Sequence, residues 1–393
     1  MTKIEEMIAE LCHNGIEWKE LGEVCEIQRG VRITKNQLLP SGYPVVSGGT
    51  GYMGYTDNYN REAGTITIAQ YGTAGYVNMQ KEKFWANDVC FSVYPKDILV
   101  NKYLYYVLSN KQEYLYSISN RTAVPYSISK DKILKIKIPI PSLEIQEEIV
   151  KILDKFTEYV TELTAELTLR QKQYNYFRDY LLNFDSNNSG GGANNKVYQV
   201  EWKTLKDVAK LKNGKDWKSL SVGDVPVYGS GGAMGEFVSE YAYDKPTVLI
   251  PRKGSISNLF YLEKPFWNVD TIYYTEIDES QVVPRYLYYY LTTIDLESMA
   301  TNPTRLSLTQ AILNKIPIPV PSFPIQQRIV QVLDNFDAVC NDLNIGLPKE
   351  IELRQKQYEY FREKLLTFTA EGVYPGQWTV DSGQWTVSGE RPT

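Results

Sequence analysis

The 393-residue chain contains a single histidine, His13, and only four cysteines, Cys12, Cys25, Cys90 and Cys340. One histidine close to the N-terminus leaves little for histidine-based acid–base catalysis. The cysteines are scattered, with no pair at the spacing of metal ligands and no framework typical of secreted domains. We therefore expect buried thiols, and neither a metal site nor a disulfide scaffold.

Motifs that bind nucleotides or perform catalysis are also missing. The sequence has no GxxxxGK(S/T) phosphate loop, no HExxH, no paired CxxC, and no Asn-Pro-Pro-aromatic run of the type that amino-methyltransferases use for a flipped adenine. Glycine-rich stretches occur at 47–51 and 229–232, but neither is followed by Lys-Ser or Lys-Thr. They are interpreted as structural turns, and the chain is predicted to be non-catalytic by itself.

Long apolar runs and a strong net charge are absent as well. No apolar run approaches the roughly 20 residues that span a bilayer, and the N-terminus lacks a basic flank followed by an apolar core. We expect a cytoplasmic protein without membrane contact. The net charge is −5, with +2 in residues 1–142 and −3 in residues 143–184. Contacts with nucleic acid would therefore have to come from local basic loops, helped by a partner, because bulk attraction is not available.

What the sequence does contain is a long internal repeat. Residues 135–157, KIKIPIPSLEIQEEIVKILDKFT, return at 315–337 as KIPIPVPSFPIQQRIVQVLDNFD. RQKQYNYFRDYLLNF from Arg170 returns as RQKQYEYFREKLLTF from Arg354, and weaker matches extend back to Glu17 and Glu201. Each copy is a strand-rich segment, which we call a head, followed by a helix. This is a tandem duplication and not a solenoid.

Within each head, short runs of β-branched and aromatic residues alternate with glycine-rich turns, as in GTITIAQYGTAGYVNM and PTVLIPRKGSISNLFYL. Such runs predict strands in antiparallel or mixed sheets. The tyrosine-rich segments KYLYYVLSN and RYLYYYLTT predict one helix per head. Packing of these tyrosines onto the sheet is favoured over a stacking platform for bases, since neighbouring tyrosines of a helix cannot all face one ligand.

The segments after the heads have the alternating four- and three-residue apolar spacing of a coiled coil. The first seam runs from Ile145 to Leu181, and the second from Ile325 to Phe368. A helix over the first segment would be about 60 Å long. Pro141-Ser142 and Pro321-Ser322 predict helix starts with serine as the N-cap.

Two details of the seams qualify this prediction. Gly346-Leu347-Pro348 should break or kink the second helix. Arg170 and Arg354 are charged residues at seam positions. Either they contact acidic groups across the helix pair and fix its register, or they extend to solvent; both alternatives stay open.

The predicted fold class is α+β: a tandem pseudo-twofold repeat of two mixed, strand-rich domains separated by two long helices packed as an antiparallel coiled coil. The expected boundaries are 1–143 for the first domain, 144–184 for the first helix, 185–200 for a flexible linker, 201–323 for the second domain, 324–369 for the second helix, kinked near 346–348, and 370–393 for a weakly ordered tail. The linker is inferred from its composition.

Three polar, glycine-bearing loops recur at matching positions of the two heads. The candidate DNA-binding residues are Gln28, Arg29, Arg32, Lys35, Gln70, Tyr71, Asn120, Arg121, Tyr126 and Ser127 in the first head, and Lys212, Asn213, Lys215, Lys218, Arg252, Lys253, Asn302, Thr304, Arg305 and Ser307 in the second. Arg, Asn and Gln can pair bidentately with base edges, whereas Lys mostly meets phosphate. For any single residue, a merely solvated turn is favoured over DNA contact. The argument for DNA is that the loops recur while their residues differ, as in Gln70 against Arg252, Arg121 against Thr301 and Tyr126 against Leu306.

On these helical motifs the chain resembles the specificity subunits of type I restriction-modification systems, particularly the IC-like group. The resemblance is carried by the two copies of the IPIP segment and by GLPKEIELRQKQYEYFREKLL and TELTAELTLRQKQYNYFRD, and it spans residues 15–369. It implies a host-defence subunit with two target-recognition domains, each of which binds one half of a split site in double-stranded DNA. It also implies long helices that dock two methyltransferase subunits, and restriction subunits that join the same assembly. S-adenosylmethionine, ATP and magnesium would then be bound by these partners, and no cofactor by this chain.

The segment TELTAEL at 161–167 resembles tetrapeptide repeats that vary in number in this group, so the length of the first helix should set the unread gap between the half-sites. An alternative function stays open. The chain could be a pseudo-symmetric coiled-coil scaffold that holds two copies of a protein partner without contacting DNA.

Overall fold

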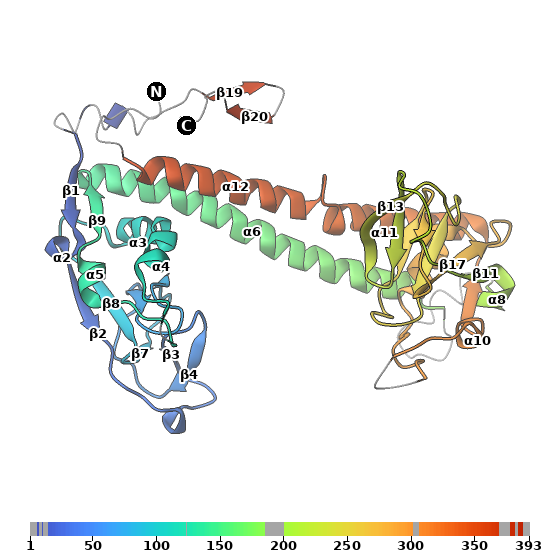
Figure 1. Ribbon diagram of the computed structural model, residues 1–393, viewed down its shortest axis with the longest axis horizontal. Helices are drawn as coiled ribbons and strands as arrows, with labels where there is room; N and C mark the ends of the chain where they lie inside the picture. The colour runs from blue at the N-terminus through green and yellow to red at the C-terminus, as the bar shows by residue number, and fades with distance from the viewer. Residues whose placement is uncertain are drawn as a thin grey trace. The chain divides into compact units, whose positions relative to one another are not determined.

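The computed structural model describes residues 6–7, 10, 15–122, 124–184, 200–301, 306–368, 378–381 and 384–387 (Figure 1). Two compact units are present, Met1–Glu162 with Glu352–Thr393, and Leu163–Ile351. We call them the first and second unit; each contains one head. Cys12, His13, residues 185–199 of the predicted linker and most of the predicted tail lie outside the described residues. In the tail, β19 (Trp378–Asp381) pairs with β20 (Gln384–Val387).

The first head contains three small sheets. An antiparallel sheet has the strand order β2 (Cys25–Arg29), β8 (Cys90–Pro95), β5 (Ile66–Ala69), β6 (Val77–Met79). In a second sheet, β3 (Tyr43–Val46) pairs antiparallel with β4 (Tyr52–Thr56) and parallel with β7 (Trp85–Ala86). The third is a ribbon of β1 (Glu17–Glu20) and β9 (Lys137–Ile140), which brings the start of the head next to its end.

The second head has the same topology. Its strands are β11 (Ala209–Asn213), β17 (Ile272–Ile277), β14 (Thr247–Pro251) and β15 (Phe260–Leu262) in the first sheet, β13 (Gly232–Val238), β12 (Val225–Gly229) and β16 (Trp267–Asn268) in the second, and β10 (Glu201–Thr204) with β18 (Pro317–Val320) in the ribbon. The glycine-rich stretches at 47–51 and 229–232 lie at the β3–β4 and β12–β13 connections. The prediction of two related heads with mixed helix and strand content is confirmed.

Short helices cover the strands of each head. The first head has α2 (Leu21–Val24), η1 (Lys35–Gln37), α3 (Asn101–Asn110), α4 (Gln112–Ile118) and α5 (Lys130–Leu134), and the second has α8 (Leu205–Val208), α9 (Pro284–Leu291) and α10 (Gln310–Leu313). The tyrosine-rich segments are α3 and α9. Tyr103 and Tyr286 are fully buried in the two cores, and Tyr106 and Tyr289 are buried beside them. Their role is to pack the helix onto the sheet, as predicted.

Each core includes part of a long helix. In the first unit, Ile145, Ile149 and Leu153 of α6 (Leu143–Leu182) are buried with Leu365 and Leu366 of α12 (Leu347–Leu366). The second unit buries Ile329 and Leu333 of α11 (Phe323–Asn341) together with the end of α6. A head and the start of the helix that follows it therefore share one hydrophobic core, which fixes the direction in which the helix leaves the head.

The two long segments differ in continuity. The first forms the 40-residue helix α6, whereas the second consists of α11 and α12. Gly346 lies between them, and a Cβ atom on this residue would lie 2.6 Å from the carbonyl oxygens of Ala338 and Asp342. A residue other than glycine would therefore force the backbone apart at this junction.

The prediction that serine hydroxyls cap the two long helices is wrong. Ser322 occupies the N-cap position of α11, but its hydroxyl makes no hydrogen bond to the helix. The Ser142 hydroxyl is buried and has no hydrogen-bond partner. Buried glutamines one turn further along, Gln146 and Gln326, bond the carbonyls of Pro141 and Pro321 just before these helix starts.

Arg170 is one of the two seam arginines whose role stayed open. It contacts Glu166 at 3.3 Å and Gln173 at 3.2 Å, both on its own helix. Arg354 donates to Gln357 at 2.9 Å, likewise on its own helix. These contacts are intrahelical, so they give no support to a register-fixing contact with an acidic group.

The cysteines that the structure describes are buried. Cys25, Cys90 and Cys340 are buried free thiols, as predicted, and burial raises the pKa of Cys25 and Cys90 to about 12. Such thiols are inert at neutral pH. Within the described ranges, no cluster of three His, Cys, Asp or Glu side chains could hold a metal ion, and no helix combines the length and apolarity that a bilayer span requires.

Candidate nucleic-acid interface

In the first head, two of the predicted loops meet. The Ile128 amide donates to the Gln70 carbonyl at 2.9 Å, and the Gly72 amide donates to the Tyr126 carbonyl at 3.0 Å. Tyr71 and Ser127 form a β-bridge. Residues about 50 positions apart in the sequence therefore form one continuous surface, as the candidate interface requires.

The second head makes the same junction. The Leu308 amide donates to the Arg252 carbonyl at 2.9 Å, and Lys253 forms a bridge with Ser307. Thr301 donates to the Ser307 carbonyl at 3.2 Å. Three of the predicted residues, Asn302, Thr304 and Arg305, lie outside the described residues.

These bonds correct one alignment made from the sequence. In the first head the donor to the Ser127 carbonyl is Asn120, at 2.7 Å. Thr301 therefore corresponds to Asn120, and its pairing with Arg121 is wrong. The loop lengths differ by one residue, which a gap-free comparison of the two copies cannot detect.

The third loop follows β2 and is attached to the turn that precedes β8. The Val31 amide donates to the Ala86 carbonyl at 2.8 Å, and the Gln70 amide donates to the Val89 carbonyl at 2.9 Å in the same turn. A Cβ on Gly30 would lie 2.1 Å from the Asn87 carbonyl oxygen, so glycine is needed for this close approach. We call residues 86–90 the anchor turn of the first head, because two of the loops hydrogen-bond to it.

Residues 268–272 form the anchor turn of the second head. The Lys215 amide donates to the Asn268 carbonyl, and the Arg252 amide donates to the Thr271 carbonyl, each at 2.9 Å. A Cβ on Gly214 would lie 2.0 Å from the Val269 carbonyl oxygen. Both heads thus hold the loops after β2 or β11 and after β5 or β14 on equivalent turns.

Three of the predicted arginines are oriented by neutral groups. Arg29 Nε donates to the Asp88 carbonyl at 2.6 Å, and Arg252 Nη1 donates to the Asp270 carbonyl at 3.4 Å. The Arg252 guanidinium also lies 5.5 Å from the Tyr273 ring centre. Arg121 lies between two rings, 5.6 Å from Tyr116 and 5.8 Å from Tyr126. Carbonyls and rings hold a guanidinium in place without cancelling its charge.

Other predicted residues are engaged by the protein itself. Lys212 pairs with Glu276 at 3.3 Å, Gln28 donates to Glu26 at 3.0 Å, and the Asn213 side-chain oxygen accepts from Gln310 at 3.4 Å. The Gln70 side-chain oxygen is enclosed and has no hydrogen-bond partner. The side chains of Arg32, Lys35, Lys215, Lys218 and Lys253 also stand exposed on the loops.

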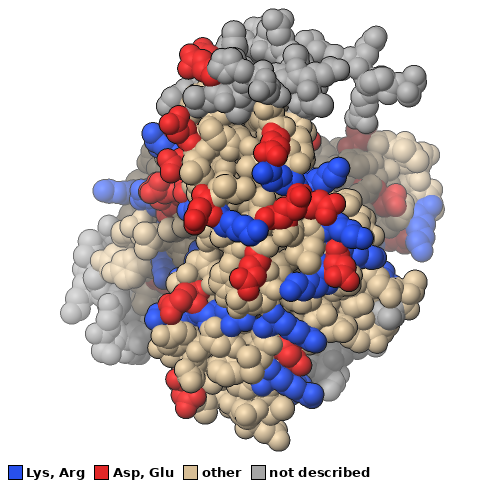
Figure 2. Space-filling view, turned by 90° about the vertical axis from the view of Figure 1, so that its left-hand side faces the viewer, with Lys and Arg blue, Asp and Glu red and all other residues tan. Residues whose placement is uncertain are grey.

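Charge is not gathered into one basic surface on the face shown in Figure 2, where Lys and Arg alternate with Asp and Glu. This agrees with the weak net charge of the heads. Binding of a polyanion would therefore depend on individual loop residues, such as Arg29 and Arg121, more than on a broad positive field.

Sequence reasoning missed two kinds of residue. Arg61 donates to Ser92 at 2.8 Å, to the Asn60 carbonyl at 2.7 Å and to the Arg29 carbonyl at 3.0 Å. It therefore holds the end of β2 in place. Gln146 and Gln326 are fully buried and join each head to its helix. The one sequence signal for a structural role of these glutamines is that both copies of the repeat have Ile-Gln at the same place.

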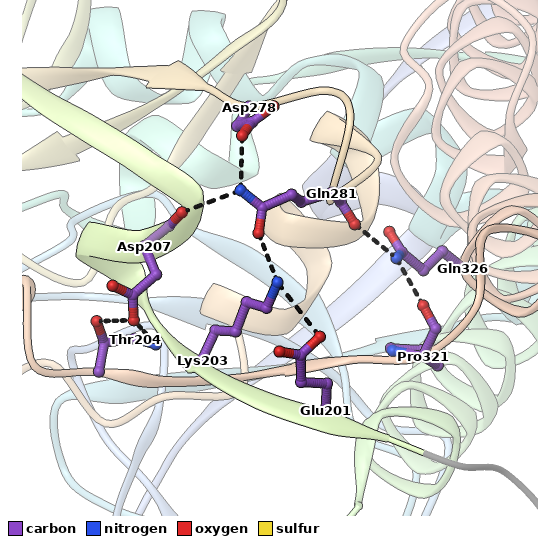
Figure 3. A network of polar contacts seen from close by, with 8 residues as sticks. All are labelled: Glu201, Lys203, Thr204, Asp207, Asp278, Gln281, Pro321 and Gln326. Atoms are coloured by element: carbon purple, nitrogen blue, oxygen red, sulfur yellow. Dashed lines mark hydrogen bonds and ion pairs between the residues drawn. The ribbon is translucent and has the colours of Figure 1, made fainter.

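Figure 3 shows the polar network around Gln326. Its Nε2 atom donates to the carbonyls of Gln281 at 3.1 Å and Pro321 at 2.8 Å, and its Oε1 atom accepts from the Val283 amide at 2.8 Å. Gln281 in turn accepts from Lys203 at 2.7 Å. The glutamine thus joins the start of α11 to the loop that enters α9 and, through Gln281, to β10.

Gln146 repeats this arrangement in the first head. It accepts from the Val100 amide at 2.8 Å and donates to the carbonyls of Ile98 at 3.0 Å and Pro141 at 2.8 Å. In both heads, a buried glutamine therefore attaches the domain that holds the loops to a long helix in the same way.

An aspartate on each long helix makes a second attachment. Asp334 accepts from Arg285 at 2.8 Å and from the Tyr289 hydroxyl at 2.5 Å. Asp154 accepts from Lys102 at 2.7 Å and from the Tyr106 hydroxyl at 2.5 Å. Burial, followed by the bond to the aspartate, raises the pKa of both tyrosines. They therefore stay protonated donors at physiological pH.

Replacing Gln326 with alanine is expected to destabilise the second unit by about 2 to 3 kcal/mol, because the Val283 amide, the Gln281 carbonyl and the buried Pro321 carbonyl lose their partner. Urea unfolding of the chain measures this. Gln171→Ala, an exposed glutamine of α6, is the matched control and should change the stability by less than about 0.5 kcal/mol. Equal stability of the two variants would contradict the attachment.

Comparison with known protein families gives two matches along this chain. The family model described as "Type I restriction modification DNA specificity domain" matches residues 14–171 and again residues 199–353. Each match includes one head and the greater part of the helical segment that follows it, and the two matches start where the two copies of the repeat start.

Similar proteins span the whole repeat. The putative type I restriction enzyme specificity subunit S.HindORF215P of Haemophilus influenzae is 34% identical over 382 residues, covering 90% of this chain and 96% of that protein. The EcoR124I/EcoR124II specificity subunit of Escherichia coli is 32% identical, with 90% and 94% covered. The crystal structure of the type I restriction-modification S subunit from M. genitalium has a TM-score of 0.67 at 23% identity, covering 91% of this chain and 98% of that one. The last of these shows that the fold is shared.

Proposed function

The chain belongs to the family of the type I restriction modification DNA specificity domain, and we propose that it is the DNA sequence-specificity subunit of a type I restriction-modification complex. Each head binds one half of a bipartite site in double-stranded DNA. The chain is a recognition subunit and contributes no catalytic group. The two heads, residues 1–143 and 201–323, are accordingly the target-recognition domains.

One observation carries this proposal. Equivalent anchor turns hold equivalent loops in both heads, and the residues that these loops present are different, as with Gln70 and Arg252. A common scaffold with different readers is what recognition of two unlike half-sites needs. A scaffold for two copies of a protein partner would instead favour the same residues in both loops, and the relatives give no support to that alternative.

The long helices have two roles in this proposal. Phe156 of α6 stacks on Phe361 of α12 in the first unit, with ring centres 5.1 Å apart, and Phe177 of α6 stacks on Phe336 of α11 in the second, at 5.4 Å. Both pairs support antiparallel packing of the two seams as a coiled coil. This coiled coil sets the gap between the half-sites and offers two equivalent surfaces to two methyltransferase subunits.

The partners supply the chemistry. The methyltransferase subunits bind S-adenosylmethionine and methylate adenine, and restriction subunits that hydrolyse ATP with magnesium complete the assembly in the cytoplasm. This chain contributes the loop residues that contact DNA, including the exposed Lys35, Lys218 and Lys253, whose charges meet phosphates.

Salt dependence tests DNA binding. The complex of this chain with its methyltransferase subunits should lose affinity for DNA steeply between roughly 50 and 200 mM salt, because phosphate contacts release counterions. Fluorescence anisotropy with a labelled duplex measures the loss. The methyltransferase subunits alone are the control, and an equally weak, salt-independent signal from both samples would contradict the proposal.

A further inference from the structure

In the anchor turn of the first head, most carbonyls are used by the backbone. Ala86 accepts from the Val31 amide at 2.8 Å, Asn87 from the Cys90 amide at 3.0 Å, and Val89 from the Gln70 amide at 2.9 Å. The Asp88 carbonyl accepts instead from a side chain, Arg29 Nε. One acceptor of the turn therefore serves to orient an arginine.

The second anchor turn has the same pattern. Asn268 accepts from the Lys215 amide at 2.9 Å, Val269 from the Ile272 amide at 3.2 Å, and Thr271 from the Arg252 amide at 2.9 Å. The Asp270 carbonyl, equivalent to that of Asp88, again accepts from an arginine, through Nη1 of Arg252. The same acceptor thus orients one guanidinium in each head.

The two arginines come from different elements. Arg29 is the last residue of β2, which we call the strand position, and its counterpart at the end of β11 is Asn213. Arg252 is the first residue after β14, the loop position, and its counterpart after β5 is Gln70. The first head therefore has an arginine at the strand position and a carboxamide at the loop position. The second head has the carboxamide at the strand position and the arginine at the loop position.

Both guanidinium groups keep their charge. Among the described residues, neither Arg29 nor Arg252 forms an ion pair with a carboxylate. Arg285, which attaches α9 to α11, is by contrast held by Asp334 at 2.8 Å and Asp337 at 3.4 Å. Arg29 is exposed and is bonded through Nε, so both of its terminal amino groups stay available. Arg252 is bonded through Nη1 and keeps Nε and Nη2.

Two parallel N–H donors on a fixed, unneutralised guanidinium match the O6 and N7 acceptors of guanine in the major groove. We propose that Arg29 recognises a guanine in one half-site and Arg252 a guanine in the other, at two different positions relative to the anchor turn. This inference rests on the proposed function and adds the identity of one base pair in each half-site. The lysines of the same loops do not carry this information, because they meet phosphates.

The test compares methylated motifs. The chain is expressed with its methyltransferase subunits, without the restriction subunits, and methylated adenines are located by single-molecule sequencing. Both half-sites of the wild-type motif should contain an invariant G·C pair. In Arg29→Asn, discrimination at one G·C pair of one half-site should fall about 5- to 150-fold while the other half-site is unchanged, and Arg252→Gln should give the converse result. Each variant takes the residue that the other head has at that position.

Lys35→Ala is the matched control, an exposed lysine of the same first-head segment. It should lower methylation of all sites evenly and leave the motif as it is. The unaffected half-site of each variant reports that the chain folds and assembles. A split motif that lacks a G·C pair in either half-site, or that keeps full discrimination in Arg29→Asn and Arg252→Gln, would overturn the inference and leave the proposed function standing. Absence of any split motif would instead overturn the proposed function.

Discussion

Replacing residues 201–323 with the equivalent head of another specificity subunit is expected to change one half of the methylated site completely and to leave the other half unchanged. The exchange is physically feasible because the β10–β18 ribbon closes the head on itself: Glu201 pairs with Val320, and Thr204 with Pro317. Both junctions then lie next to each other, at the start of α11. The part of the hydrophobic core that belongs to the head is transferred together, while Ile329 and Leu333 of α11 stay in place and must pack against the new head.

The incoming head must keep the attachment to the helix. Gln326 and Asp334 lie on α11 and stay in place, so the new head has to offer carbonyls at the Gln281 position and a basic residue at the Arg285 position. Exchange of residues 17–142 is the reciprocal control and should alter the opposite half-site. A change in both halves after either exchange would show that the heads do not act independently.

Duplicating residues 164–167 is expected to lengthen the unread gap and to leave both half-sites unchanged. Four residues add about 6 Å to an α-helix, which corresponds to one or two base pairs at about 3.4 Å each. The insertion is tolerable because residues 161–168 of α6 are exposed or half-buried, whereas its buried anchors, Ile145, Ile149 and Leu153, belong to the first core.

The matched control places the same four residues in the predicted linker, after Gly191. The composition of that segment predicts a flexible linker, so the gap should not change. The measurement is the motif of adenine methylation in cells that express each variant with the methyltransferase subunits. An unchanged gap after the insertion in α6 would contradict the role of this helix as the spacer.

The helices and the duplication were predictable from sequence because both signals are local. The seam spacing predicts helices over residues 145–181 and 325–368, and the observed helices α6, α11 and α12 occupy these segments. The tyrosines of α3 and α9 are buried or half-buried in the cores, and their packing onto the sheet was predictable because neighbouring tyrosines of a helix cannot all face one ligand. The heads also followed from local strand and turn signals, since each strand is short and bounded by glycine or polar residues.

The candidate site was less predictable, because its order depends on contacts between distant residues. Sequence gave no indication that Lys212 is neutralised by Glu276, or that Gln28 is bonded to Glu26. In the sequence, Arg29 and Arg252 belong to loops at different positions of the two heads. Only the folded turn shows that both bond to equivalent carbonyls, those of Asp88 and Asp270, about 60 and 20 residues away along the chain.

Capping is a second instance of the same limit. A serine that follows proline is a sound local signal for a helix start, and Ser322 does occupy that position. Its hydroxyl does not cap the helix, and the buried polar residue at this helix start is Gln326, whose contacts with Gln281 and Val283 are more than 40 residues away in sequence. A buried glutamine on an otherwise apolar helix face has no local signature that distinguishes it from a surface residue.

The methylated motif of the unmodified chain tests the central claim most directly. The chain and its methyltransferase subunits are expressed together in cells without other adenine methylation, and the genome is sequenced by a method that detects N6-methyladenine. The account predicts one motif of two specified half-sites separated by a fixed, unspecified gap, because two different heads are joined by a helix of fixed length. Methylation at a continuous motif, or the same methylation when this chain is omitted, would contradict it.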